Sequence, residues 1–219
     1  MMRRSLSAGE ERTLLDTVSR HGAATARRDH AWMRALRFSG CRIGEFSLVS
    51  VGAALMALDT RHLFIPREHR KGGRIDHTVL VTAQLREALQ DLLEARCEMT
   101  GEKAPDRHAP LVVNRYGTKL SVRSYEKRMA YWCRVAGLEV QATPHWFRHT
   151  RAMRIMQRSG AADPRGMVQV ALGHADIKSS GVYTQPTRED FQAAMEAADG
   201  APAMRKRDAR RVYAARMAS

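Results

Sequence analysis

The sequence predicts a mainly α-helical (α+β) domain, a helical bundle with a small three-stranded antiparallel sheet at one edge. Three observations predict this fold class. Apolar residues recur at three- and four-residue intervals over most of the 219 residues, as on the buried faces of helices. Capping residues (Ser, Thr, Asp) precede these stretches and glycines follow them. The three short runs typical of strands lie between residues 53 and 82.

The N-terminal part predicts three helices in succession. Residues 7–10 read Ser-Ala-Gly-Glu, a capping box that opens the first helix. A second helix is predicted over residues 25–39, and Gly40 is the residue that ends it. A short helix begins directly after this glycine and extends to about Val49. Its first residues include Arg42, which the pattern therefore places at a helix junction.

The spacing of apolar residues changes from a helical to a strand-like period after these helices. Residues 54–58, 62–66 and 77–82 are predicted to be the three strands of the sheet. The connection between the last two, residues 67–74, contains two glycines and is strongly basic. Lys71 is the only lysine in this connection.

Helical spacing resumes in the C-terminal half. Thr143-Pro144 indicates a helix start, because Thr caps amide groups and Pro lacks the N–H that would be left without a partner. His145 and Arg148 then share one face of the first turns. A helix N-terminus favours an anion, so this pair of an imidazole and a guanidinium indicates a phosphate site. The helices predicted in this half are residues 85–93, 121–136, 143–159, 163–172 and 187–198.

Charge and cysteine usage restrict the class of protein. The net charge is +14, which favours nucleic acid as the partner over a merely solvated basic surface. Cys41, Cys97 and Cys133 show no paired or metal-like spacing, as expected in a reducing cytoplasm. No apolar run approaches the ~18 residues of a membrane span. We therefore expect a cytoplasmic, nucleoid-associated protein that does not enter membranes.

Five segments of the chain follow one another in a distinctive order. They are Ser39-Gly40-Cys41-Arg42-Ile43-Gly44-Glu45, the connection holding Lys71, His145-Trp146-Phe147-Arg148-His149, Leu172-Gly173-His174, and Tyr183-Thr184. Together they resemble the catalytic domain of the tyrosine recombinases, the phage-integrase family. Each segment alone is weak evidence, but their order, and the nine-residue interval between His174 and Tyr183, are specific to the family, over about residues 6–198.

The resemblance implies an integrase-type fold and a site-specific DNA recombinase that cuts and rejoins strands through a 3′-phosphotyrosyl bond. Tyr183 would be the nucleophile, and His145 its proton acceptor. Lys71 would protonate the departing 5′-oxygen, and His174 would donate a hydrogen bond to the phosphate. No metal, ATP or other cofactor is implied. The implied catalytic set is Arg42, Lys71, His145, Arg148, His174 and Tyr183, with Arg42 and Arg148 binding the non-bridging oxygens and Glu45 orienting Arg42.

The same resemblance carries expectations about organisation and partners. We expect a tail over residues 1–5, a catalytic domain over 6–198, a basic tail over 199–219 and no separate N-terminal DNA-gripping domain. The partners implied are double-stranded DNA, other copies of the chain in a tetramer on DNA, and accessory DNA-binding proteins. The expected DNA contacts, with an ordinary solvated surface as the alternative, are Lys119, Arg123, Lys127, Arg205, Lys206, Arg207, Arg210 and Arg211.

Other interpretations stay open. One alternative is a type IB topoisomerase-like enzyme that relaxes DNA, and another is a catalytically silent DNA-binding regulator. His145 and His149 also have the spacing of a zinc pair, but Trp146 stands where a zinc hydrolase has its glutamate. Tyr116, Tyr125, Tyr131 and Tyr213 compete with Tyr183 as nucleophile.

Overall fold

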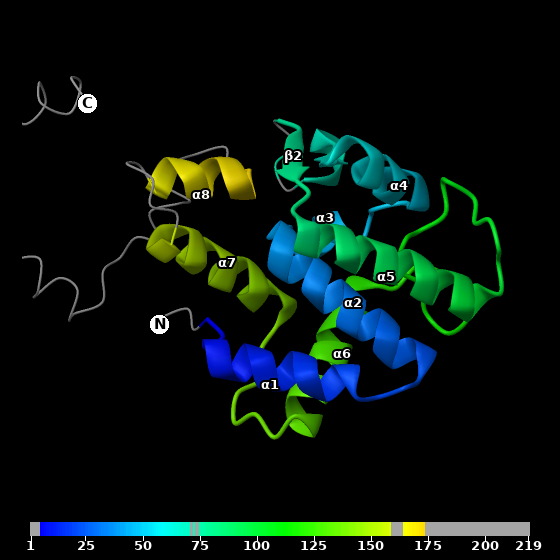
Figure 1. Cartoon of the computed structure of the whole chain (residues 1–219), viewed down its shortest axis with the longest axis horizontal. Coiled ribbons are helices and arrows are strands. Elements are labelled where there is room, and N and C mark those ends of the chain that lie inside the picture. Colours follow the sequence, from blue (N-terminus) through cyan, green and yellow to red (C-terminus); the bar gives the residue numbers. More distant parts are fainter. Residues whose placement is uncertain (1–4, 71, 73–74, 159–163, 174–219) are drawn as a thin grey trace, which may run out of the picture. The chain divides into compact units, whose positions relative to one another are not determined.

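The computed structural model describes residues 5–70, 72, 75–158 and 164–173. The chain divides into two compact units, residues 1–183 and 184–219, and every described residue belongs to the first. The elements of this unit are shown in Figure 1. In chain order they are α1 (Ala8–Ser19), α2 (Ala24–Ser39), α3 (Ile43–Phe46), α4 (Val51–Thr60), β1 (His62–Ile65), the 3₁₀ turn η1 (Arg67–His69), β2 (His77–Leu80), α5 (Ala83–Thr100), α6 (Val122–Val135), α7 (Pro144–Arg158) and α8 (Pro164–Leu172).

The helix boundaries follow local capping chemistry. The Ser7 hydroxyl accepts from the Glu10 amide at 3.1 Å, and the Glu10 carboxylate accepts from the Ser7 amide at 2.9 Å. This is the predicted capping box at the start of α1. Gly40 ends α2 in the left-handed conformation (φ 68°), where a glycine is least strained. The predicted start of α1 and the predicted end of α2 are therefore confirmed.

Helix α2 lies at the centre of the unit and packs against α1, α5 and α7 (Figure 1). Its Trp32 is fully buried and meets the ring of Tyr125 on α6 edge to face, with centroids 5.1 Å apart. Asp29, also on α2, accepts from the indole N–H groups of Trp32 (3.0 Å) and Trp132 (2.8 Å). This buried carboxylate also pairs with a neighbouring arginine, Arg28. The core around α2 thus contains one satisfied charge cluster besides its apolar side chains.

The sheet has two strands among the described residues. Strands β1 and β2 pair antiparallel, with Phe64 opposite Thr78, and their Leu63, Ile65, His77 and Val79 face the core. Residues 62–66 and 77–82 were predicted as strands, and the structure confirms both approximately. The third predicted strand, residues 54–58, is wrong.

Residues 54–58 belong to helix α4. The Ser50 hydroxyl caps it by accepting from the Ala53 amide at 3.2 Å. The buried residues Val51, Ala54 and Ala57 recur every three positions, which is a helical spacing. A short apolar run satisfies both helical and strand patterns, and the alanine, leucine and methionine in it favour a helix.

No helix among the described residues is both long and apolar enough to cross a bilayer.

Candidate active site

Arg42 and Glu45 form the first half of the candidate site. Arg42 is the residue before α3, and its guanidinium donates to Glu45 Oε1 at 2.8 Å while its amide donates to Oε2 at 3.0 Å. Glu45 is 2% exposed, whereas the Arg42 side chain is 34% exposed. The buried carboxylate therefore holds the guanidinium of Arg42 on one side, and part of the guanidinium still faces solvent. We predicted that Glu45 orients Arg42, and this geometry is compatible with that prediction.

The electrostatics of Glu45 connect it to the second arginine of the motif. Burial alone raises the pKa of Glu45, but the Arg42 hydrogen bonds and the charges of Arg42 and Arg148 bring it below its ordinary value. The carboxylate is thus ionised at neutral pH and lies in the field of both guanidiniums.

Arg148 lies on α7 and is 1% exposed. It donates to the Gly40 carbonyl at 2.6 Å and to the Leu172 carbonyl at 2.9 Å. These two carbonyls terminate α2 and α8, so one guanidinium stabilises the negative ends of two helices. Gly40 is two residues before Arg42, and Leu172 is two residues before His174. Arg148 therefore ties together two of the predicted motif segments.

Arg70 adds a third guanidinium to this region. It is the residue after η1 and next to Lys71, and it is 9% exposed. Its Nη1 donates to the Ile75 carbonyl at 2.7 Å and its Nη2 donates to the Gly173 carbonyl. Its Nε lies 3.5 Å from Glu45 Oε1. Three arginines thus surround one carboxylate, which leaves a net positive charge suited to an anion.

Close packing at Gly173 explains the glycine in the Leu-Gly-His segment. Gly173 has φ 61°, and a Cβ on it would lie 2.5 Å from Cγ of His77 and 2.9 Å from Nη2 of Arg70. His77, on β2, is 5% exposed. Burial and the charge of Arg70 lower the pKa of His77, so the ring is neutral at pH 7. Only a glycine fits between this imidazole and the guanidinium.

The histidines of α7 have different surroundings. His145 is exposed at the start of the helix, and His149 is 5% exposed one turn later. Their ring centroids are 6.3 Å apart. Within residues 5–158 and 164–173, apart from the gaps at 71 and 73–74, no three potential ligands among His, Cys, Asp and Glu are grouped to hold a metal ion. The zinc alternative thus gains no third ligand from this part of the chain.

The structure brings Arg42, Glu45 and Arg148 together, and it places His145 at the exposed first turn of α7 that carries Arg148. Three predicted catalytic residues, Lys71, His174 and Tyr183, lie outside the described residues. The same holds for the predicted tail contacts Arg205, Lys206, Arg207, Arg210 and Arg211.

The remaining predicted DNA contacts lie at the surface. Lys119, Arg123 and Lys127 are all exposed. Their neighbour Arg128 is different, because it pairs with the buried Asp29 and stacks over the Trp132 ring at 5.3 Å. Arg128 therefore belongs to the core charge cluster described above.

The described tyrosines differ in their access to substrate. Tyr125 is fully buried, and burial strongly raises the pKa of its phenol. Tyr131 is 39% exposed and meets Trp132 edge to face at 4.9 Å. Tyr116 is 71% exposed. Burial also raises the pKa of the Cys41 thiol to about 11, so this cysteine is not a nucleophile at neutral pH.

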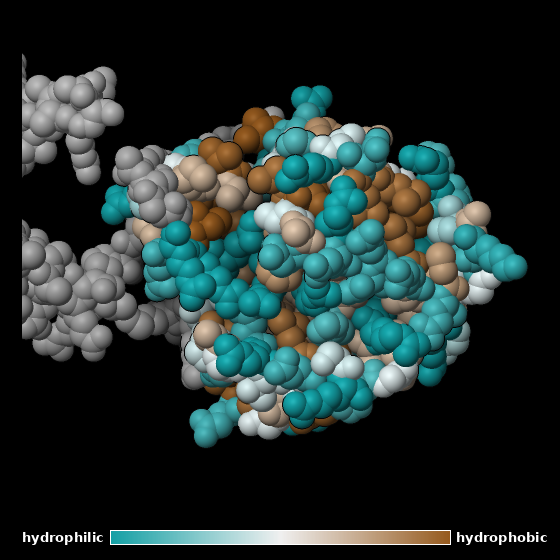
Figure 2. Space-filling model, viewed as in Figure 1, coloured by the Kyte–Doolittle hydropathy of each residue, from teal (hydrophilic) through white to brown (hydrophobic). Residues whose placement is uncertain are grey.

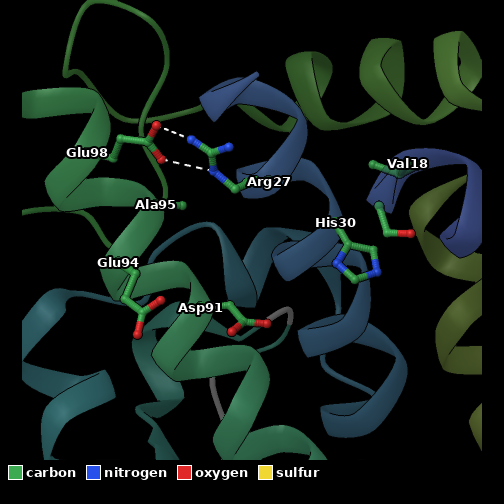
Figure 3. A pocket seen from close by; sticks show the side chains of 8 residues that line it. Val18, Arg27, His30, Asp91, Glu94, Ala95 and Glu98 are labelled. Atoms are coloured by element: carbon green, nitrogen blue, oxygen red, sulfur yellow. Dashed lines mark hydrogen bonds and ion pairs between the residues drawn. The ribbon is translucent and has the colours of Figure 1, made fainter. Parts of the chain in front are cut away.

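A pocket of about 290 Å³ between α1, α2 and α5 has another character (Figure 3). Two of its three acidic residues are engaged in ion pairs: Glu98 accepts two hydrogen bonds from Arg27, as Figure 3 shows, and Asp91 pairs with Arg34. Burial lowers the pKa of His30 beside them. The pocket shares no residue with the Arg42–Glu45–Arg70–Arg148 cluster, and its ion pairs join α2 to α5.

The sequence profile of the phage integrase family matches residues 4–190. The chain belongs to this family. The predicted family and fold class are therefore confirmed, with two strands among the described residues in place of three.

Curated relatives of this phage-integrase chain include tyrosine recombinases named XerC. The protein from Shewanella amazonensis is 34% identical over 200 residues, which cover 89% of this chain and 60% of that protein. The protein from Neisseria meningitidis is 31% identical over 172 residues, or 78% and 52% of the two chains. The chain thus spans about half to three fifths of the length of these relatives.

Solved structures of two recombinases show the same fold. The XerA recombinase gives a TM-score of 0.69 at 21% identity, over 92% of this chain and 65% of that one. The XerH site-specific recombinase bound to a palindromic difH substrate gives 0.64 at 22% identity, over 91% and 54%.

Two residues of this phage-integrase site were not predicted from the sequence. In the sequence, Arg70 is one of several basic residues in the connection that holds Lys71, and His77 is the first residue of a predicted strand. The one available signal was the inward position of His77 in an alternating strand, since a histidine there is either buried against a partner or functional. Nothing in the local pattern distinguishes Arg70 from the other basic residues of the connection.

Proposed function

We propose that this chain is the catalytic part of a site-specific DNA recombinase of the integrase or invertase type. The carrying observation is the cluster in which Arg42, Arg70 and Arg148 surround the ionised Glu45 at the meeting point of α3, α7 and α8. A cluster of this charge, built on conformationally fixed backbone, is suited to a phosphodiester. The XerC relatives are tyrosine recombinases, which supports the same activity.

The proposed reaction is a metal- and ATP-independent transesterification. Tyr183 would attack the phosphorus, form a bond from its phenolic oxygen and release the 5′-oxygen. His145, exposed at the start of α7, would accept the phenolic proton. Lys71 would protonate the departing oxygen. The new phosphotyrosyl bond conserves the energy of the broken one, so the reverse attack rejoins the strands.

The two motif arginines would stabilise the charge that develops on the non-bridging oxygens. Arg42 is one-third exposed and would meet an oxygen directly with paired N–H donors. Arg148 is held between the Gly40 and Leu172 carbonyls and would contribute its charge from a fixed position. His174, which follows Leu172 by two residues, would donate a further hydrogen bond to the same phosphate.

We propose that residues 6–198 form the catalytic domain and residues 199–219 a basic tail, acting at cytoplasmic, nucleoid-associated DNA. Exposed Lys119, Arg123 and Lys127 would contact the phosphate backbone together with the tail arginines. Each such contact releases counterions, so log K should fall linearly with log salt by about 0.9 per phosphate contact. Replacing Arg123 and Lys127 by Ala should reduce this slope by about 2 without changing sequence preference.

We further propose that copies of the chain assemble on DNA, with a C-terminal segment of one copy bound by the next. A groove of about 590 Å³ lies between α2, β2, α7 and α8. Apolar surface gathers over α8 and β2 in Figure 2, and the groove residue Val170 is 74% exposed. Arginines at the groove, among them Arg151 and Arg154, complement the charge of residues 187–198, whose sequence contains three acidic residues and one basic residue.

The deciding experiment is covalent capture on DNA. Incubation with nicked duplexes of randomised core sequence should give an SDS-resistant protein–DNA adduct enriched in one sequence. A type IB topoisomerase-like enzyme would instead relax supercoiled DNA with no sequence preference. A silent regulator would bind DNA and form no adduct under any condition.

A further inference from the structure

We propose that Arg70 is a positioning residue for the phosphate-binding end of this site. The inference rests on the proposed recombinase function and deepens it. Arg70 itself would touch no substrate, because its side chain is 6% exposed. It would act by holding two segments together: Glu45, which orients Arg42, and the C-terminal end of α8, which leads to His174.

The burial of Arg70 indicates a specific task. A buried guanidinium is costly unless acceptors surround it. The partners of Arg70 are three carbonyl groups, of Ile75 at 2.7 Å, Asp76 at 3.4 Å and Gly173, and the Glu45 carboxylate, whose Oε1 lies 3.5 Å from Nε in an ion pair. They come from three segments that are distant in sequence or lie across a loop. A surface arginine of a basic connection needs none of these contacts.

The contact with Gly173 supplies a hydrogen-bond donor to a carbonyl at the C-terminal end of α8. The last carbonyls of a helix have no partner within the helix, and they carry partial negative charge. Arg148 donates to the Leu172 carbonyl, and Arg70 donates to the next one, the Gly173 carbonyl. Two guanidiniums therefore fix two successive peptide units immediately before His174. A shift of either peptide unit would displace the backbone nitrogen from which His174 begins.

The contact with Glu45 connects this helix end to Arg42. Oε1 of Glu45 accepts from Arg42 at 2.8 Å and faces Nε of Arg70 at 3.5 Å. The same oxygen is thus shared by an exposed and a buried guanidinium. The planar guanidinium of an arginine can contact a carboxylate and a carbonyl at the same time, whereas the ammonium of a lysine is a single point charge. Arg70→Lys therefore keeps the charge and loses the bridge.

Gly173 and His77 form the remaining walls around Arg70. A Cβ on Gly173 would lie 2.9 Å from Nη2 of Arg70, and the His77 ring lies against the same glycine. The pocket is therefore shaped to one guanidinium position. A side chain that contributes only to stability does not require such a fit. Substitutions of Arg70 should therefore lower the cleavage rate more than they lower the folded fraction.

The test compares single-turnover cleavage by the unsubstituted 219-residue chain, Arg70→Lys and Arg70→Met. Arg70→Met fills much of the same buried volume without a charge and serves as the second variant if Arg70→Lys does not fold. Arg67→Ala is the matched control, because Arg67 is exposed in the same connection. The substrate is a duplex selected by covalent capture, used with an ordinary phosphodiester or with a 5′-bridging phosphorothiolate, whose thiolate leaves without protonation.

We expect the Arg70 variants to cleave both substrates at least ten-fold more slowly than the unsubstituted chain, with Arg67→Ala unchanged. The loss persists on the phosphorothiolate because the defect lies in phosphate binding. Cleavage within three-fold of the unsubstituted rate by a folded Arg70 variant would overturn the inference. So would full rescue by the phosphorothiolate, which would assign Arg70 to leaving-group protonation. Absence of any adduct with the unsubstituted chain would instead refute the proposed function, on which the inference depends.

Discussion

Gly173→Ala should be among the most destabilising single-methyl additions in the described part of the chain. The residue has φ 61°, where a side chain costs about 1 kcal/mol. The added Cβ would lie 2.5 Å from Cγ of His77, and overpacking of this kind costs about 1–3 kcal/mol. Together these effects lower the free energy of unfolding by about 2–4 kcal/mol. For a chain of this size we expect Tm to fall by roughly 4–16 °C.

Gly101→Ala is the matched control for this prediction. Gly101 also ends a helix, α5, with φ 72°, but nothing lies within 4 Å of a Cβ built on it. It therefore reports the backbone cost alone. Urea unfolding followed by circular dichroism should show Gly173→Ala to be less stable than Gly101→Ala by at least 1 kcal/mol. Equal losses in the two variants would refute the close packing of Gly173 against His77.

Three further predictions concern stability and assembly. Asp29→Asn should lower the free energy of unfolding by about 3 kcal/mol in urea titrations, because it leaves the buried Arg28 without its counter-charge. The pKa of His77 is lowered in the folded state, so its stabilising contribution is complete above pH ~6.5 and is lost as the pH falls below that value. His77→Leu should therefore flatten the Tm profile between pH 7 and 5 only in part, since His30 titrates in the same direction; an unchanged profile would contradict this assignment. Val170→Glu, at a position 74% exposed, should leave Tm within about 2 °C but reduce the higher-order DNA complexes resolved on native gels; undiminished complexes would argue against the α8 groove as the assembly surface.

Local chemistry determined which parts of the fold were predictable. The capping box at Ser7 and the stop at Gly40 were predicted because hydrogen-bond partners three residues apart, or a left-handed residue, specify a helix end by themselves. Helix α4 was mistaken for a strand because its run of apolar residues is compatible with both periodicities. Its helical state depends on burial of Val51, Ala54 and Ala57 against the rest of the core, which is a tertiary contact.

The candidate site shows the same division. Arg42 and Glu45 are three residues apart, so their pairing is a local property that sequence spacing reveals. The contacts of Arg148 with Gly40 and of Arg70 with Gly173 join residues more than a hundred positions apart. No periodicity encodes such contacts, because they depend on how α2, α7 and α8 meet. The resemblance of the motifs indicated which segments converge, but it did not indicate that Arg70 would be buried between them.

The most direct measurement of the central claim is covalent capture by the unsubstituted chain and by Tyr183→Phe on the same pool of nicked duplexes. Tyr116→Phe is the control, because Tyr116 is the most exposed tyrosine among the described residues. We predict an SDS-resistant adduct with the unsubstituted chain and with Tyr116→Phe, and none with Tyr183→Phe. An adduct that survives in Tyr183→Phe would contradict the account.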